Sequence, residues 1–110
     1  MARFVKGDVV VLPFPFSDLS QVKRRPALVV AQAAGNELLL CQITSQAVRD
    51  RYAVALSEAD FQSGSLKKQS NVRPNRVFTA DAGVIAYSAG RLHDPKTREV
   101  VEKLVSLLRE

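Results

Sequence analysis

The chain has 110 residues, of which 46% are hydrophobic and 25% charged, and its formal net charge is +5. These values predict one globular domain over residues 1–110, with a core of its own. Because no apolar stretch approaches the roughly 18 residues of a membrane span and no signal-peptide core is evident, we expect a cytoplasmic protein without membrane contact. A single cysteine, Cys41, excludes an internal disulfide and a cysteine-based zinc site.

Strand signals dominate the first half of the chain. The expected strands are residues 9–12, 27–31, 38–43 and 52–56. The first is expected to end at Pro13, because proline gives no hydrogen-bond donor to a central strand. Residues 17–25 are then expected to form a polar, basic loop, and Pro26 to start the next strand.

The second half predicts shorter strands and one helix. Ser57 is typical of a residue that caps a short helix, and Gly64 would break that helix. Short strands are expected at residues 71–73, 76–79 and 84–87. Asp94-Pro95 has the order of a helix start, and apolar residues then recur at helical spacing up to Leu108. The fold expected is mainly β, a compact SH3-like antiparallel barrel with short helices and a C-terminal helix.

The positive charge is unevenly placed along the chain. From Asp94 onward, four basic and four acidic residues cancel, so the excess lies in residues 1–93. Basic clusters occur at residues 23–25, 49–51, 67–68 and 73–76. Such clusters favour phosphate binding through counterion release, although a solvated basic surface without a ligand is the alternative.

Two polar groups stand at predicted strand ends where folding does not require them. Arg25 precedes a proline, which restricts the approach of its backbone. Thr44 closes an apolar strand and holds its hydroxyl on a rigid element. An arginine and a hydroxyl with no histidine nearby indicate chemistry on a phosphate.

Several short motifs follow one another in a characteristic order. They are Gly7-Asp8-Val9-Val10, Phe14-Pro15-Phe16, Lys23-x-Arg25-Pro26-Ala27-Leu28-Val29, Gln42-Ile43-Thr44-Ser45-Gln46, Ser70-x-Val72-Arg73, Phe78-Thr79-x-Asp81 and Gly90-x-Leu92. In this order, and over nearly the whole chain, they resemble the MazF/PemK-type toxins of type II toxin–antitoxin systems. The resemblance implies a homodimeric, ribosome-independent endoribonuclease that cuts single-stranded RNA without a metal or another cofactor. It also implies 2′,3′-cyclic phosphate and 5′-hydroxyl products, and a cognate antitoxin with an extended acidic segment.

Carried over by position, the resemblance makes Arg25 and Thr44 catalytic. Arg25 would stabilise charge on the non-bridging oxygens, since a guanidinium is too basic to act as a general base. Thr44 would contact the scissile phosphate or orient the 2′-hydroxyl. The RNA-binding residues expected are Lys23, Arg24, Ser45, Gln46, Lys67, Lys68, Arg73 and Asn75.

The sequence leaves the general base open. One branch of the family carries an aspartate where this chain has Asn75, and an asparagine has no titratable group. Asp18 is the first candidate and water the second. Without that aspartate, the chain also fits a non-catalytic RNA-binding or antitoxin-docking module. A CcdB-like gyrase poison has a related fold but depends on a C-terminal tryptophan, and this chain has no tryptophan.

Overall fold

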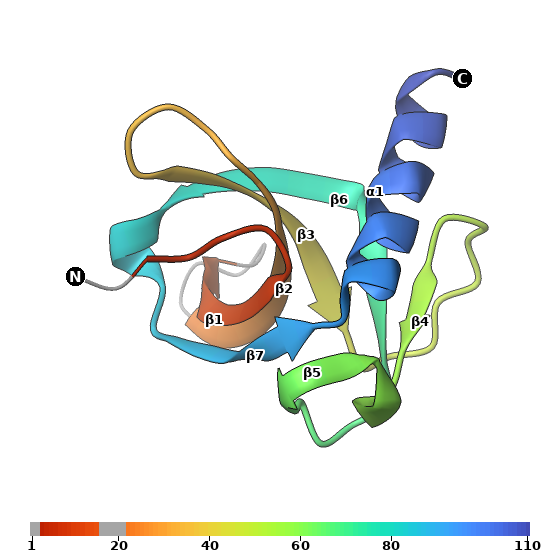
Figure 1. The fold of residues 1–110 in the computed structure, drawn as a ribbon, viewed down its shortest axis with the longest axis horizontal. Coiled ribbons are helices and arrows are strands. Elements are labelled where there is room, and N and C mark those ends of the chain that lie inside the picture. Colours follow the sequence, from red (N-terminus) through yellow and green to blue (C-terminus); the bar gives the residue numbers. More distant parts are fainter. Residues whose placement is uncertain (1–2, 16–21) are drawn as a thin grey trace.

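The computed structural model describes residues 3–15 and 22–110 and contains a curved, seven-stranded antiparallel sheet (Figure 1). The strands are β1 (Asp8–Pro15), β2 (Val22–Gln32), β3 (Glu37–Thr44), β4 (Val54–Leu56), β5 (Phe61–Gly64), β6 (Ser70–Asp81) and β7 (Tyr87–Leu92). Their order in the sheet is β4-β6-β3-β2-β1-β7-β5. Two short 3₁₀ helices, η1 (Glu58–Asp60) and η2 (Ala82–Val84), and the helix α1 (Asp94–Leu108) accompany the sheet. The expected mainly β fold with a C-terminal helix is confirmed.

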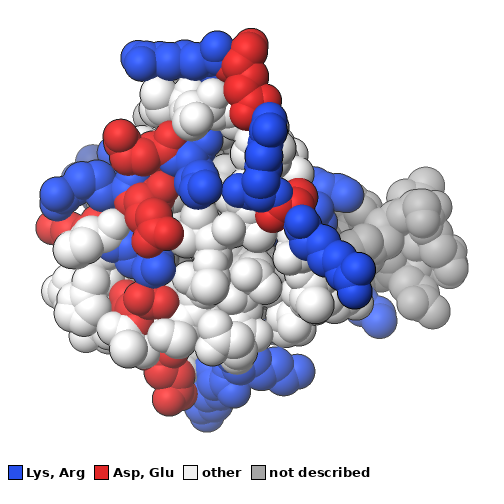
Figure 2. Space-filling model, turned by 90° about the vertical axis from the view of Figure 1, so that its right-hand side faces the viewer, with Lys and Arg blue, Asp and Glu red and all other residues white. Residues whose placement is uncertain are grey.

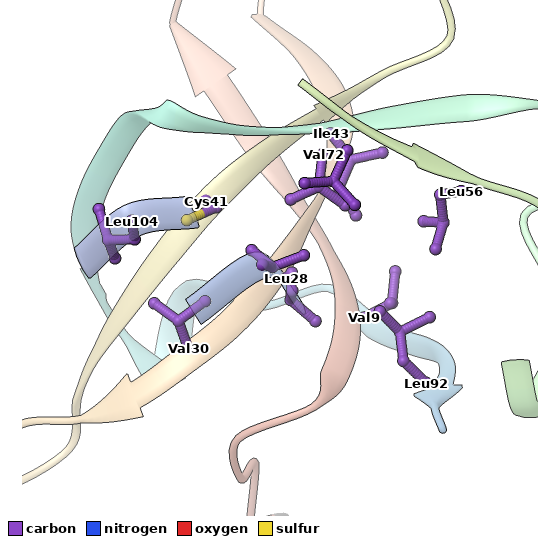
Figure 3. Packing of buried hydrophobic residues seen from close by; sticks show 11 residues of the cluster. Val9, Leu28, Val30, Cys41, Ile43, Leu56, Val72, Leu92 and Leu104 are labelled. Atoms are coloured by element: carbon purple, nitrogen blue, oxygen red, sulfur yellow. The ribbon is translucent and has the colours of Figure 1, made fainter. Parts of the chain in front are cut away.

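Alternation along the strands divides the core into two clusters on opposite faces of the sheet. The helix-side core includes Leu28, Cys41 and Ile43 of the sheet and Leu104 of α1 (Figure 3). Val100 of α1 belongs to the same cluster. The second cluster, called here the open-side core, takes the intervening residues: Val10, Leu12, Ala27, Val29, Leu38 and Leu40.

Cys41 belongs to the helix-side core and is fully buried. Burial raises the pKa of its thiol to about 12, so the thiol stays protonated and unreactive at neutral pH. Because residues three apart on a strand face opposite sides, Thr44 lies on the open side.

β1 and β2 are longer than the sequence predicted. β1 continues through Pro13 to Pro15, and β2 begins at Val22, so the basic residues expected in a loop lie in a strand instead. The prolines fit because β1 beyond Val11 pairs with β2 alone. β2 likewise pairs with β3 only from Ala27 on, so Pro26 has a paired neighbour on one side only.

The other departures from the predicted strands involve β5, β6 and β7. β6 is one strand where two short ones were expected, and β7 begins where the expected strand at 84–87 ends. β5 was not predicted. A Cβ on Gly64 would overlap the backbone of Ala89, and one on Gly90 would overlap the backbone of Ser63, so these strands need glycines that a strand pattern disfavours.

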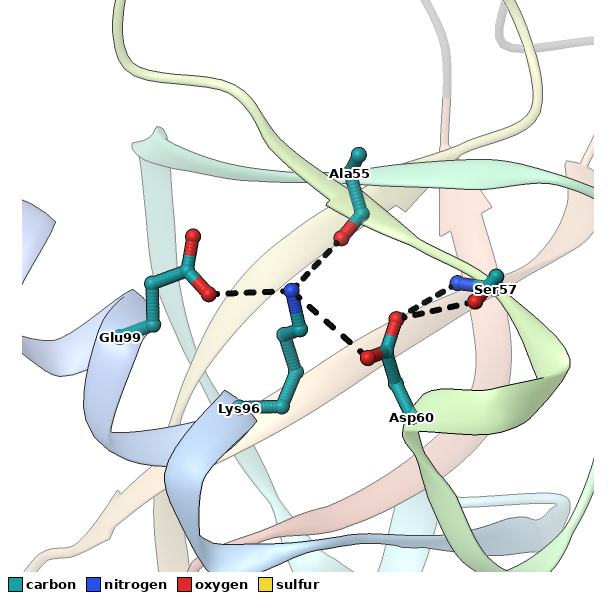
Figure 4. A network of polar contacts seen from close by, with 5 residues as sticks. All are labelled: Ala55, Ser57, Asp60, Lys96 and Glu99. Atoms are coloured by element: carbon teal, nitrogen blue, oxygen red, sulfur yellow. Dashed lines mark hydrogen bonds and ion pairs between the residues drawn. The ribbon is translucent and has the colours of Figure 1, made fainter.

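Lys96 of α1 contacts the segment around η1 (Figure 4). Its Nζ donates to Glu99 Oε1 at 3.0 Å and to the Ala55 carbonyl at 3.2 Å, and it lies 3.7 Å from Asp60 Oδ1. Asp60 also accepts from the Ser57 backbone N–H at 2.8 Å. Ser57 is the N-cap residue, as predicted, but the helix it precedes is only the 3₁₀ turn η1. On the side that carries α1, β4 and β5, acidic and basic side chains are interspersed around uncharged residues (Figure 2).

Replacing Leu28 with alanine should lower the free energy of unfolding by about 2–5 kcal/mol, because it leaves a cavity between α1 and the sheet. Leu108 is the matched control, since it is 75% exposed at the end of α1. Leu108→Ala should change stability by less than about 0.5 kcal/mol. Urea denaturation measures both variants, and equal losses would contradict the packing described.

Candidate active site

A pocket of about 210 Å³ lies on the open side of the sheet, and residues of β2, β3 and β6 line it. Its lining residues are Arg25, Gln42, Ile43, Thr44, Gln46, Arg73 and Arg76. Guanidinium groups offer several N–H donors and a permanent positive charge, which suit an oxyanion such as a phosphate. The arrangement is therefore an anion site with a hydroxyl in its wall.

The register of β2 and β3 brings Arg25 and Thr44 together. Ala27 and Gln42 form the last pair of the β2–β3 ladder at this end, and Arg25 and Thr44 each lie two residues beyond that pair. Arg25 precedes the open-side residues Ala27 and Val29 at a spacing of two, and Thr44 follows Leu40 and Gln42 at the same spacing. On each strand, the series of side chains that forms the open-side core therefore ends in a polar side chain that lines the pocket.

A bulge in β6 adds two arginines to this pocket. Cys41 pairs with Val77, but the next residue, Gln42, pairs with Arg73, so residues 74–76 bulge out of the strand. On a regular strand Arg73 and Arg76 would face opposite sides. The bulge instead lets both line the same pocket, whereas Asn75 between them is exposed and does not line it.

The loop after Thr44 closes one side of the pocket. Thr44 Oγ1 accepts a hydrogen bond from the Gln46 backbone N–H at 3.1 Å, which leaves its own proton to be donated. The Gln46 carbonyl in turn accepts from Asn71 Nδ2 at 3.5 Å. Gln46 lines the pocket, while Ser45 is exposed and does not.

A second hollow of about 300 Å³ shares Thr44, Gln46 and Arg73 with this pocket, and Asp50 lines the hollow but not the pocket. Asp50 Oδ2 accepts from Arg73 Nη2 at 3.1 Å, and Oδ1 accepts from the backbone N–H groups of Tyr52 at 3.0 Å and Ala53 at 2.9 Å. Partial burial acts to raise the pKa of Asp50, but these hydrogen bonds and the charge of Arg73 outweigh it and lower the pKa. Asp50 is therefore an ionised, weakly basic carboxylate.

A more apolar hollow of about 500 Å³ adjoins the pocket and shares Gln42 and Arg76 with it. Phe14 and Phe78 meet in its wall edge to face, with ring centroids 4.9 Å apart. Both rings also pack on the open-side core. Polar and aromatic surfaces therefore lie next to each other on this face.

The structure gathers four of the predicted site residues in one pocket: Arg25, Thr44, Gln46 and Arg73. The other predicted RNA-binding residues are exposed and do not line it: Lys23, Arg24, Ser45, Lys67, Lys68 and Asn75. Asp18, the first candidate for the base, lies outside the described residues.

The binding candidates drawn from the sequence did not include three residues that the structure places here. Gln42 shares the parity of Thr44, so alternation along β3 was the signal that points to it. Arg76 enters through the bulge, and Asp50 through a loop, and neither position follows from a sequence period.

Within residues 3–15 and 22–110, no group of three or more His, Cys, Asp and Glu side chains could hold a metal ion. No helix in this part of the chain is long and apolar enough to cross a membrane.

Comparison with known proteins identifies the family. Residues 5–108 match the family of PemK-like, MazF-like toxins of type II toxin–antitoxin systems. The chain belongs to this family. The resemblance stated from the motifs is therefore confirmed at the level of the family. A search of curated proteins found no match.

Solved structures of this family share the fold. MazF from Deinococcus radiodurans is 24% identical, with a TM-score of 0.77 and 100% of each chain covered. A MazE–MazF complex from the same organism is 26% identical, with a TM-score of 0.73, 98% of this chain and 97% of that chain covered. An endoribonuclease in complex with its cognate antitoxin, from a mycobacterial species, is 13% identical, with a TM-score of 0.78, 97% of this chain and 96% of that chain covered.

The pKa of Asp50 offers a direct test of the ion pair. In Arg73→Ala the pKa should rise, because burial remains while the strongest side-chain donor is lost. A carboxylate with a lowered pKa stabilises the fold above its unfolded pKa, and this contribution disappears as the pH falls through the folded pKa. Carboxyl ¹³C NMR titration measures the value in both proteins. An unchanged pKa in Arg73→Ala would contradict the pairing.

Proposed function

We propose that this protein is a toxin endoribonuclease that cleaves single-stranded RNA by attack of the 2′-hydroxyl on the adjacent phosphodiester. The observation that carries the proposal is the pocket that Arg25, Arg73 and Thr44 line together. Its volume of about 210 Å³ suits one phosphate group with its sugar linkages rather than a large ligand. Membership of the MazF/PemK family supports the same assignment.

In the proposed cleavage step, Arg25 and Thr44 both act on the phosphate group. The 2′-oxygen forms a bond to phosphorus while the bond from phosphorus to the 5′-oxygen breaks. Arg25 stabilises the charge that builds on the non-bridging oxygens, and the Thr44 hydroxyl donates a hydrogen bond to the phosphate or orients the 2′-hydroxyl. The 2′-hydroxyl proton leaves to a base and the 5′-oxygen gains a proton, which gives a 2′,3′-cyclic phosphate and a 5′-hydroxyl.

The base in this scheme is Asp18 or a water molecule. Asp50 is a poor choice, although it lies behind Arg73, because both of its oxygens already accept hydrogen bonds. We propose that no metal ion or other cofactor takes part. The guanidinium groups bring the positive charge that a metal ion would otherwise supply to the phosphate.

The proposed partners follow from the same chemistry. An RNA strand places one phosphate at the Arg25 pocket, and a base rests against the apolar hollow beside Phe14 and Phe78. A cognate antitoxin with an extended acidic segment would compete for the same arginines. The complexed toxin structures similar to this chain support such a partner. We further propose that the toxin acts in the cytoplasm as a homodimer.

Arg25→Ala should lower kcat for RNA cleavage by about 100- to 1,000-fold while RNA affinity falls much less, since Arg25 acts on transition-state charge. Arg24→Ala is the matched control, because it removes the same charge from the neighbouring position on the other face of β2. Cleavage of a long single-stranded RNA and binding of an uncleavable 2′-O-methyl analogue measure the two quantities.

Equal losses of cleavage in the two variants would remove Arg25 from the chemistry. Binding of RNA by a folded wild-type protein that leaves the strand intact would instead support a non-catalytic RNA-binding module. The shortage of carboxylates around the pocket would then be the physical reason, since within the described residues Asp50 is the only carboxylate that lines either the pocket or the hollow behind Arg73.

A further inference from the structure

We propose that Asp50 is a positioning residue of this active site, which holds the Arg73 guanidinium against the pocket that contains Thr44. The inference rests on the proposed endoribonuclease function. It assigns a role to a loop carboxylate that neither accepts a substrate proton nor contacts the RNA.

The hydrogen bonds of Asp50 show how one side chain acts on two elements. Oδ1 accepts from the backbone N–H groups of Tyr52 and Ala53 and so fixes the end of the loop formed by residues 45–53. Oδ2 accepts from Arg73 Nη2 on β6. The carboxylate is therefore a rigid bridge between the loop that follows Thr44 and the strand that carries Arg73.

Arg73 depends on this bridge for its orientation. Its side chain is 22% exposed, and its Nε has no hydrogen-bond partner within the described residues. The bond to Asp50 is the hydrogen bond that the structure gives to its guanidinium. Since arginine loses considerable rotamer freedom when it is fixed, removal of Asp50 would let the guanidinium move away from the pocket.

The loop itself has a second attachment, so the loss of Asp50 need not unfold it. Tyr52 Oη donates to Glu110 Oε1 at 2.7 Å, and Arg51 Nη2 lies 2.8 Å from the same oxygen. Lys103 Nζ of α1 also donates to the Arg51 carbonyl at 3.3 Å. These contacts attach residues 51 and 52 to Lys103 of α1 and to Glu110, without using the Asp50 carboxylate.

Two alternative roles for Asp50 make different predictions. A carboxylate that acted only through its charge would repel the RNA phosphates, so its neutralisation would tighten binding and preserve or raise cleavage. A general base would need a free oxygen and a pKa nearer to neutrality, whereas both oxygens of Asp50 accept hydrogen bonds and its pKa is lowered. A positioning role predicts lower cleavage without weaker overall attraction to RNA.

A double-mutant cycle tests the proposal through the partner that Asp50 is inferred to act on. Asp50→Asn keeps an oxygen for the loop N–H groups but removes the charge that holds Arg73. It should lower kcat by about 10- to 100-fold, as expected for a misplaced group, while KM stays constant or falls. In the Arg73→Ala background the same substitution should have no further effect. An independent, additive loss in the double variant, or full activity of Asp50→Asn, would overturn the proposal.

Asp60→Asn is the matched control. Asp60 also accepts a backbone N–H bond and faces a cation, Lys96, but it lines neither the pocket nor the hollow behind Arg73. This variant should cleave at the wild-type rate. Should Asp50→Asn fail to fold, Asp50→Ser takes its place in the cycle, because the serine hydroxyl can accept a loop N–H bond without pairing with Arg73.

A second readout separates this proposal from the nuclease assignment. The ¹⁵N order parameter of Arg73 Nε should fall from a rigid value to below about 0.6 in Asp50→Asn and stay unchanged in Asp60→Asn. If wild-type protein leaves RNA intact, the nuclease assignment fails, while the order parameter still decides whether Asp50 holds Arg73. An equally rigid Arg73 in Asp50→Asn would overturn the positioning role whatever the activity.

Discussion

The alternation of side chains along β2 and β3 is the constraint on which the rest of this structure depends. One set of residues, including Leu28 and Cys41, is buried beneath α1, and the intervening set forms the open-side core. A shift of either strand by one residue would exchange its two sets and turn Arg25 or Thr44 away from the open side. The same register that forms the core therefore fixes Arg25 and Thr44 on the open side.

The pocket brings three positively charged side chains close together, and the fold must limit the repulsion between them. Arg25, Arg73 and Arg76 line one small space, where like charges repel each other. Asp50 offsets part of this charge from behind Arg73 without occupying the pocket. In our account this arrangement leaves the open side of the pocket to an anionic ligand and keeps one arginine in a defined orientation before the ligand arrives.

Local patterns were sufficient to predict the parts of this structure that repeat. The apolar spacing after Asp94 predicted α1, and the strands around Val29 and Leu40 were predicted from their β-branched and apolar runs. The motifs placed Arg25, Thr44, Gln46 and Arg73 among the site residues, and they meet in one pocket. Their catalytic and binding roles stay predictions.

Other features depend on contacts between distant segments, and a single local pattern does not contain them. Lys23 and Arg24 lie in a strand because β1 continues to pair with β2 past Pro13. The bulge at residues 74–76 exists only relative to β3, and it decides that Arg76 enters the pocket while Asn75 does not. Asp50 pairs with Arg73 across 23 residues of sequence, so no local pattern indicates this contact.

The chemistry of the cleaved ends tests the central claim most directly. Wild-type protein would be incubated with a long single-stranded RNA in excess EDTA, and the termini at each cut would be mapped and identified. Our account predicts cuts at a recurrent short motif that carry 5′-hydroxyl and 2′,3′-cyclic phosphate ends, with no cut where a single 2′-deoxy nucleotide replaces the attacking ribose. Ends with a 5′-phosphate, or cleavage that persists at the 2′-deoxy position, would contradict it.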